Sequence, residues 1–118
     1  MKQIRFIAIL SFVLCLFVVT ACTSSGPDQC DSFATLQTKA IQGKDPTLCA
    51  SISVADCRDE CYNYAATNAY QPDACVKISK SSIRDACYSS NAANTHNAAL
   101  CDRVERADLK KICLDNAK

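Results

Sequence analysis

The sequence predicts an all-α fold of short, disulfide-stapled helical hairpins that repeat every 26 residues and stack as a small α-solenoid. Three observations support this prediction. Cysteines recur at a fixed spacing, apolar residues step by four along one face of each copy, and no copy alternates apolar and polar residues as a strand would. The chain has 118 residues, and we place one such domain at residues 30–118.

The repeat is defined by two sets of cysteines that keep one register. The first set is Cys49, Cys75 and Cys101, and the second is Cys61, Cys87 and Cys113. An aliphatic position shared by the copies is filled by Ile52, Ile78 and Val104. These matches divide the domain into repeats at 45–70, 71–96 and 97–118, with an N-terminal helix at 30–43 before them. A fixed period of this length is typical of proteins in which each copy is one supersecondary unit.

Each unit is expected to contain a short helix, a tight bend and a longer helix. In the first unit, Asp45 can cap the short helix and Pro46 suits its first turn. Ser53, with Asp56 three residues later, resembles the start of the longer helix. Gly43 is expected to stop the N-terminal helix.

Residues 1–21 have the pattern of a secretory signal peptide, because a positive start is followed by an apolar stretch and by small residues before a cut site. The apolar stretch has about 14 residues, whereas a membrane-spanning helix needs roughly 20. Val19-Thr20-Ala21-Cys22 resembles the lipobox of prokaryotic membrane lipoproteins. The resemblance implies that Cys22 becomes a lipidated, palmitate-bearing N-terminus and that residues 22–29 form a tether. It also implies a cell-membrane or outer-membrane location, facing the periplasm or the exterior.

The eight other cysteines beyond the signal predict a disulfide framework, as is usual in small exported domains. In a hairpin that bends near residues 53–55, a cysteine before the bend can face one after it. The pairs expected on this basis are Cys49–Cys61, Cys75–Cys87 and Cys101–Cys113, with Cys30–Cys57 joining the N-terminal helix to the first hairpin. A rival register pairs Cys61 with Cys75 and Cys87 with Cys101, but it leaves Cys49 and Cys113 at opposite ends, so we favour the first scheme.

Residues 45–118 are similar to cysteine-bearing helical-hairpin repeats of exported archaeal and bacterial proteins. The similarity rests on C-x2-I followed by R-D-x-C-Y, the latter at Arg58–Tyr62 and Arg84–Tyr88. It implies an architecture and no activity. The Arg-Asp pair could be a catalytic signature, but the third unit carries Lys110-Lys111 there. We therefore expect these charges on the solvated side of a helix.

Other chemistry finds little support in the sequence. Cys57 and Cys61 could hold a soft metal, but only one close cysteine pair is present and His96 is distant. We therefore predict no enzyme, no catalytic residue, no cofactor and no metal site. The 13 basic and 12 acidic side chains are interspersed, which gives no basic face for nucleic acid.

The architecture favours a non-enzymatic structural or protein-interaction role in the cell envelope, because stacked hairpins present extended surfaces for an as yet unknown protein partner. Candidate interface residues are Tyr62, Tyr70 and Tyr88, of which Tyr70, in a connector, is expected to be exposed. Two alternatives remain: a small exported inhibitor of a hydrolase or toxin, and a thiol-based carrier of a soft metal.

Overall fold

The computed structural model describes residue 30 and residues 33–118. Within these residues every regular element is helical and no strand is present, so the all-α prediction is confirmed. The predicted signal peptide, the lipidated Cys22 and the tether lie outside the described residues. In the part of the chain that is described, no helix combines the length and the apolar character needed to cross a membrane.

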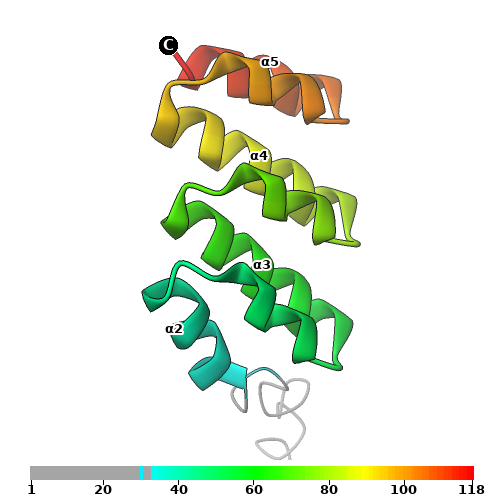
Figure 1. Ribbon diagram of the computed structural model, residues 1–118. Coiled ribbons are helices and arrows are strands. Elements are labelled where there is room, and N and C mark those ends of the chain that lie inside the picture. The colour runs from blue at the N-terminus through cyan, green and yellow to red at the C-terminus, as the bar shows by residue number, and fades with distance from the viewer. Residues whose placement is uncertain (1–29, 31–32) are drawn as a thin grey trace, which may run out of the picture.

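Three helical hairpins follow one another along the chain and lie in successive layers (Figure 1). Each pairs a 3-10 helix with a longer α-helix, so the short helix expected in each unit is a 3-10 helix. The pairs are η3 (Pro46–Ser51) with α3 (Ala55–Ala69), η4 (Pro72–Lys77) with α4 (Ser81–Thr95), and η5 (Ala98–Arg103) with α5 (Ala107–Asn116). The N-terminal helix α2 (Ala34–Gln42) packs against η3 and α3, and thereby covers the first hairpin.

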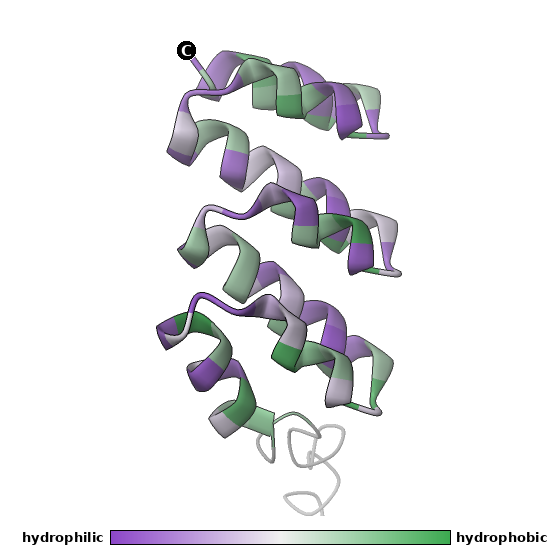
Figure 2. Cartoon of the chain, in the orientation of Figure 1, coloured by the Kyte–Doolittle hydropathy of each residue, from purple (hydrophilic) through white to green (hydrophobic). Residues whose placement is uncertain are grey.

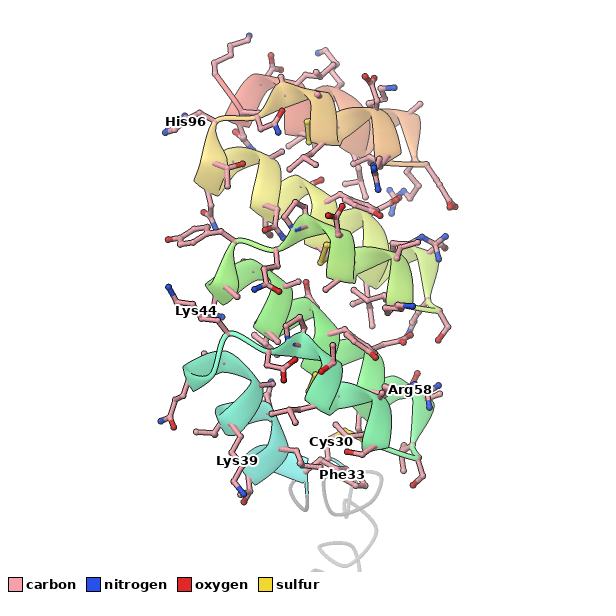
Figure 3. All side chains as sticks on the ribbon, in the orientation of Figure 1. Cys30, Phe33, Lys39, Lys44, Arg58 and His96 are labelled. Carbon is pink, nitrogen blue, oxygen red and sulfur yellow. A yellow bond between two sulfur atoms is a disulfide. The ribbon has the colours of Figure 1, made fainter. Side chains whose placement is uncertain are left out.

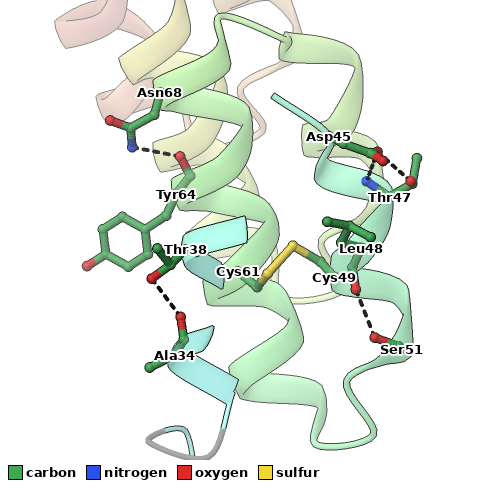
Figure 4. Close-up of a disulfide and its surroundings, with 10 residues drawn as sticks. All are labelled: Ala34, Thr38, Asp45, Thr47, Leu48, Cys49, Ser51, Cys61, Tyr64 and Asn68. Atoms are coloured by element: carbon green, nitrogen blue, oxygen red, sulfur yellow. Dashed lines mark hydrogen bonds between the residues drawn. A yellow bond between two sulfur atoms is a disulfide. The ribbon is translucent and has the colours of Figure 1, made fainter. Parts of the chain in front are cut away.

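The 3-10 helices begin as the sequence predicts, and the α-helices do not. Asp45 accepts a hydrogen bond from the backbone N–H of Thr47 at 3.0 Å, and Pro46 occupies the first helical position (Figure 4). The expected cap at Ser53 is wrong, because α3 starts after Val54 and makes no side-chain capping bond. At the starts of α4 and α5, backbone N–H groups are instead bonded by an aspartate of the preceding hairpin.

The helices that precede each unit end in the same way at three positions spaced by the repeat. Lys44, Tyr70 and His96 have φ angles of 50°, 56° and 51°, in the left-handed region. After the first of them, the N–H of Asp45 returns to the carbonyl of Ala40 at 2.9 Å, which closes the helix end. Gly43, the expected stop, is right-handed with φ −78°, so the following lysine makes the turn. Figure 3 shows Lys44 and His96 at one edge of the stack and Arg58 toward the opposite edge.

Disulfides form much of the core. The structure joins Cys49 to Cys61, Cys75 to Cys87, Cys101 to Cys113 and Cys30 to Cys57, the pairs favoured from the spacing. The six cysteines of the hairpin bridges are at most 1% exposed. Small alanines, the rings of Tyr62 and Tyr88, and one aliphatic residue per unit, Ile52, Ile78 or Val104, are also buried. Apolar residues cover only part of each helix (Figure 2), so covalent bridges compensate for a thin hydrophobic core.

Candidate functional site

The aspartates of the repeated R-D-x-C-Y stretch bind the hairpin that follows them, so the prediction that they are solvated is wrong. Asp59 is 1% exposed. Its carboxylate accepts the backbone N–H groups of Ser79 at 3.0 Å and Lys80 at 2.8 Å, as well as the Ser79 hydroxyl at 2.9 Å. Asp85 repeats this role between the second and third hairpins, where it accepts the N–H groups of Glu105 at 2.9 Å and Arg106 at 3.2 Å.

The arginines of the same stretch bind the bend of their own hairpin, and Arg84 also forms an ion pair with Glu105 of the next hairpin. Arg58 donates to the carbonyl of Ile52 at 3.1 Å, and Arg84 donates to the carbonyl of Ile78 at 3.0 Å. Each arginine therefore fixes the bend between the two helices of its unit. The repeated charges are thus a structural connector, which accounts for their recurrence without any catalytic role.

The third unit differs where the connector would be. Lys111 stands at the position of the two aspartates and is exposed, and no backbone N–H donates to its side chain within the described residues. An ammonium group cannot accept the N–H bonds that an aspartate accepts. Position 111 therefore cannot make the bonds through which Asp59 and Asp85 hold the next hairpin.

The surroundings of Asp59 stabilise its charged form. Burial raises the pKa of this carboxyl, but the bonds from Ser79 and Lys80 and the nearby charge of Arg58 lower it by more. The net result is a pKa below its usual range. The carboxylate therefore stays ionised and bound to the next hairpin at neutral pH.

A groove opens between the 3-10 helices of the first two hairpins, with a volume of about 430 Å³. This size falls in the range of about 300–1,000 Å³ that is common for ligand sites. Its lining is mostly apolar and includes one cation. The lining residues are Pro46, Thr47, Ala50, Tyr62, Gln71, Ala74 and Lys77. We call this surface the η3–η4 groove.

The equivalent space between the second and third hairpins has larger residues at the matching positions. Val76 and Leu100 stand where the η3–η4 groove has Ala50 and Ala74. Arg103 stands where the groove has Lys77, and its guanidinium lies over the ring of Tyr88, 5.6 Å from the ring centroid. Leu100 packs partly buried against the core and Val76 is 61% exposed, so the second space is lined by larger side chains of the chain itself.

A further difference concerns charge. Asp73 occupies the second space at the position of Thr47, and its negative charge acts on Arg103. In the η3–η4 groove the threonine hydroxyl donates to Asp45 instead. Lys77 forms no ion pair among the described residues. Arg103 likewise forms no ion pair there, so each space has an exposed cation, and in the second the charge of Asp73 also acts on it.

The three tyrosines predicted as interface residues have different surroundings. Tyr70 is 59% exposed in the connector, as expected. Tyr62 is 7% exposed and forms part of the groove wall, whereas Tyr88 is 3% exposed beneath Arg103. Tyr88 as an interface residue is therefore wrong. Tyr64, which the sequence reasoning did not select, is 50% exposed.

The described part of the chain contains no evident metal site. No group of three or more histidine, cysteine or acidic side chains is arranged to hold an ion there. The eight cysteines from Cys30 to Cys113 are all in disulfides, so they offer no thiolate ligand in this state. Comparison with known proteins gave no matching family, no similar curated protein and no similar solved structure.

Most of the groove residues were missed from the sequence. The sequence does contain an indication of the groove. At several repeat positions, the space between the first two hairpins has a smaller or less charged residue than the space between the second and third. The contrasting pairs are Thr47 and Asp73, Ala50 and Val76, and Ala74 and Leu100. The shared positions of a repeat build the stack, and the positions that differ create a local surface.

Proposed function

We propose that this protein is a non-enzymatic, lipid-anchored protein of the cell envelope that binds another protein through the η3–η4 groove. The groove is the observation that carries the proposal, because its apolar lining and single cation have the composition of a recognition site. The buried charges of the connector support the non-enzymatic part, since Asp59 and Asp85 are fully engaged in holding hairpins together.

The proposed location rests on the sequence and on the cysteines. Val19–Cys22 resembles a lipobox. Four disulfides are suited to an oxidising compartment outside the cytoplasm. Metabolic labelling with palmitate in a bacterial host tests this location. We expect label on the wild-type protein and none on Cys22→Ser, and an unlabelled wild-type protein would overturn the anchor.

The binding role is tested by co-purification from a detergent-solubilised envelope fraction, with three variants compared with the wild type. Ala74→Leu fills the groove with the residue that the next unit has at the same position, Leu100. Ala86→Leu makes the same change at an exposed site of α4, away from the groove. Tyr70→Ala removes the exposed connector ring.

The pattern among the variants decides between surfaces. We expect a specific partner to be lost with Ala74→Leu and retained with Ala86→Leu and Tyr70→Ala. Loss only with Tyr70→Ala would move the interface to the connector. Equal retention by all variants would overturn binding through the groove. The identity of the retained partner, a hydrolase or toxin on the one hand or an envelope protein on the other, would separate an inhibitor from a structural protein.

A further inference from the structure

We propose that the η3–η4 groove binds the C-terminal end of a partner polypeptide, with an aliphatic last side chain in the groove and the terminal carboxylate at Lys77. This inference rests on the proposed binding role and adds the chemistry of the ligand. It follows from comparing the two inter-hairpin spaces of one chain, in which the second has larger residues at the matching positions and the first has an open groove.

The apolar part of the ligand is defined by what the first space lacks. Ala50 and Ala74 stand where the next repeat has the larger Val76 and Leu100, so the first space is lined by smaller side chains. A branched aliphatic group from a partner would restore this volume against Pro46 and the ring of Tyr62. Burial of such a side chain removes apolar surface from water, so it would be the main source of affinity.

The charged part of the ligand is defined in the same way. In the first space Lys77 is exposed and has no ion pair among the described residues, and Thr47 stands where the second space has Asp73. A carboxylate from the ligand would supply the missing partner. An aliphatic group together with a carboxylate is the chemistry of a peptide ending in leucine or valine, and terminal carboxylates are a recurring target of peptide recognition.

Hydrogen-bonding groups favour a peptide over a fatty acid as the occupant. The side-chain amide of Gln71 donates to the carbonyl of Lys44 at 2.9 Å, and its carbonyl oxygen has no partner among the described residues. The hydroxyl oxygen of Thr47 likewise retains the capacity to accept, because its proton goes to Asp45. Both residues line the groove. A peptide has backbone N–H groups for such acceptors, whereas a fatty acid has none.

The test is calorimetric titration of the exported protein with three probes. The first is N-acetyl-Val-Leu with a free carboxylate, the second is its C-terminal amide, and the third is octanoate. We expect the free acid to bind at least about five-fold more tightly than the amide, the effect of one partly exposed charge pair. We also expect it to bind more tightly than octanoate. Equal affinity of acid and amide would overturn the role of the carboxylate, and equal or tighter binding of octanoate would overturn the choice of a peptide.

Variants locate the binding. Ala74→Leu should abolish titration of the acid, and Ala86→Leu should leave it unchanged. Lys77→Gln should reduce the preference for the acid over the amide to near unity, whereas Lys77→Arg, which keeps the charge, should preserve most of it. Thr47→Asp, which introduces the carboxylate of the second space, should weaken acid binding as Lys77→Gln does. Acid binding that ignores Ala74→Leu would overturn the site.

The two proposals can fail separately. If a partner is retained by the wild-type protein and lost with Ala74→Leu, but no peptide acid binds, the binding role stands and the ligand chemistry is wrong. If neither the partner nor the peptide depends on Ala74, both are wrong. Circular dichroism of each variant checks folding, and Ala74→Leu is expected to fold because the next unit carries Leu100 at the same position.

Discussion

Replacing Asp59 with alanine is expected to separate the first hairpin from the second. The substitution removes a buried carboxylate that accepts two backbone N–H groups and a hydroxyl from the next unit, at 2.8–3.0 Å. The disulfides within the hairpins remain intact, because none of them joins the first unit to the second. The predicted effect therefore concerns the contact between units rather than the units themselves.

The magnitude follows from the bonds that are lost. A hydrogen bond to a charged group contributes about 1.5–3 kcal/mol. Ser79 and Lys80 are exposed residues, so water can replace part of the loss and the lower value applies. Two backbone bonds at this value give a decrease of about 3 kcal/mol in the free energy of unfolding, which corresponds to a fall in Tm of more than about 10 °C for a domain of this size.

The assay is calorimetric or circular-dichroism melting of the exported protein under non-reducing conditions. Lys111→Ala is the matched control, because it changes an exposed side chain at the same repeat position and should shift stability by less than about 0.5 kcal/mol. Asp85→Ala should have an intermediate effect, since Asp85 accepts two N–H groups, one at 3.2 Å, and no hydroxyl. If Asp59→Ala cost no more than Lys111→Ala, the connector role would be refuted.

Three further predictions concern stability. Because the pKa of Asp59 is lowered in the folded protein, its stabilisation is present above the unfolded-state pKa of about 3.9 and is lost as pH falls through the folded value. The Tm difference between wild type and Asp59→Asn should thus be constant above about pH 5 and shrink at lower pH. A pH-independent difference would contradict the stabilising role of the ionised carboxylate. Tyr70→Gly should raise the free energy of unfolding by about 0.5–1 kcal/mol, because glycine adopts the left-handed conformation of this residue without strain. Ala69→Gly in the adjacent helix should lower it by a similar amount. A decrease with both variants would contradict the backbone strain at Tyr70. Asn91 is fully buried with no partner for its Oδ1 atom among the described residues, while its Nδ2 group donates to the carbonyl of Cys87 at 3.0 Å. The cost of the unpaired oxygen offsets the bond that the amide makes, so Asn91→Ala should change the free energy of unfolding, measured by denaturant titration, by less than about 1 kcal/mol. A larger decrease would contradict this cost.

The parts of the fold that depend on local spacing were predictable from the sequence. A helical hairpin brings residues on either side of one bend together, so Cys49 and Cys61 could be paired from their positions in a single unit. Tyr70 could be expected at the surface for a similar reason, because it lies in a connector before Pro72. These expectations use contacts within one repeat or one turn.

The role of Asp59 could not be obtained in this way. Its partners Ser79 and Lys80 belong to the next hairpin, and charged residues in the first turns of a helix are usually solvated. The sequence shows that Asp59 and Asp85 recur, but only the stacking of hairpins places each carboxylate against a following loop. The loss of the aspartate at Lys111 is compatible both with solvent exposure and with this contact, so the sequence alone does not separate the two.

The η3–η4 groove escaped prediction for a related reason. A repeat is recognised by the positions that its copies share, and the groove is made by positions at which they differ. Ala50 and Ala74 are ordinary small residues when considered alone. Their importance appears only when η3 and η4 lie side by side and the second interval shows Val76 and Leu100 at the same places.

The central claim, that the groove between the first two hairpins is the binding surface, is tested most directly by NMR of the exported protein with labelled alanine, valine and leucine methyl groups. Titration with N-acetyl-Val-Leu should shift the methyl resonances of Ala50 and Ala74 and give intermolecular contacts to them, while Val76 and Leu100 stay unchanged. Equal shifts in both pairs, or shifts only at Val76 and Leu100, would contradict the claim.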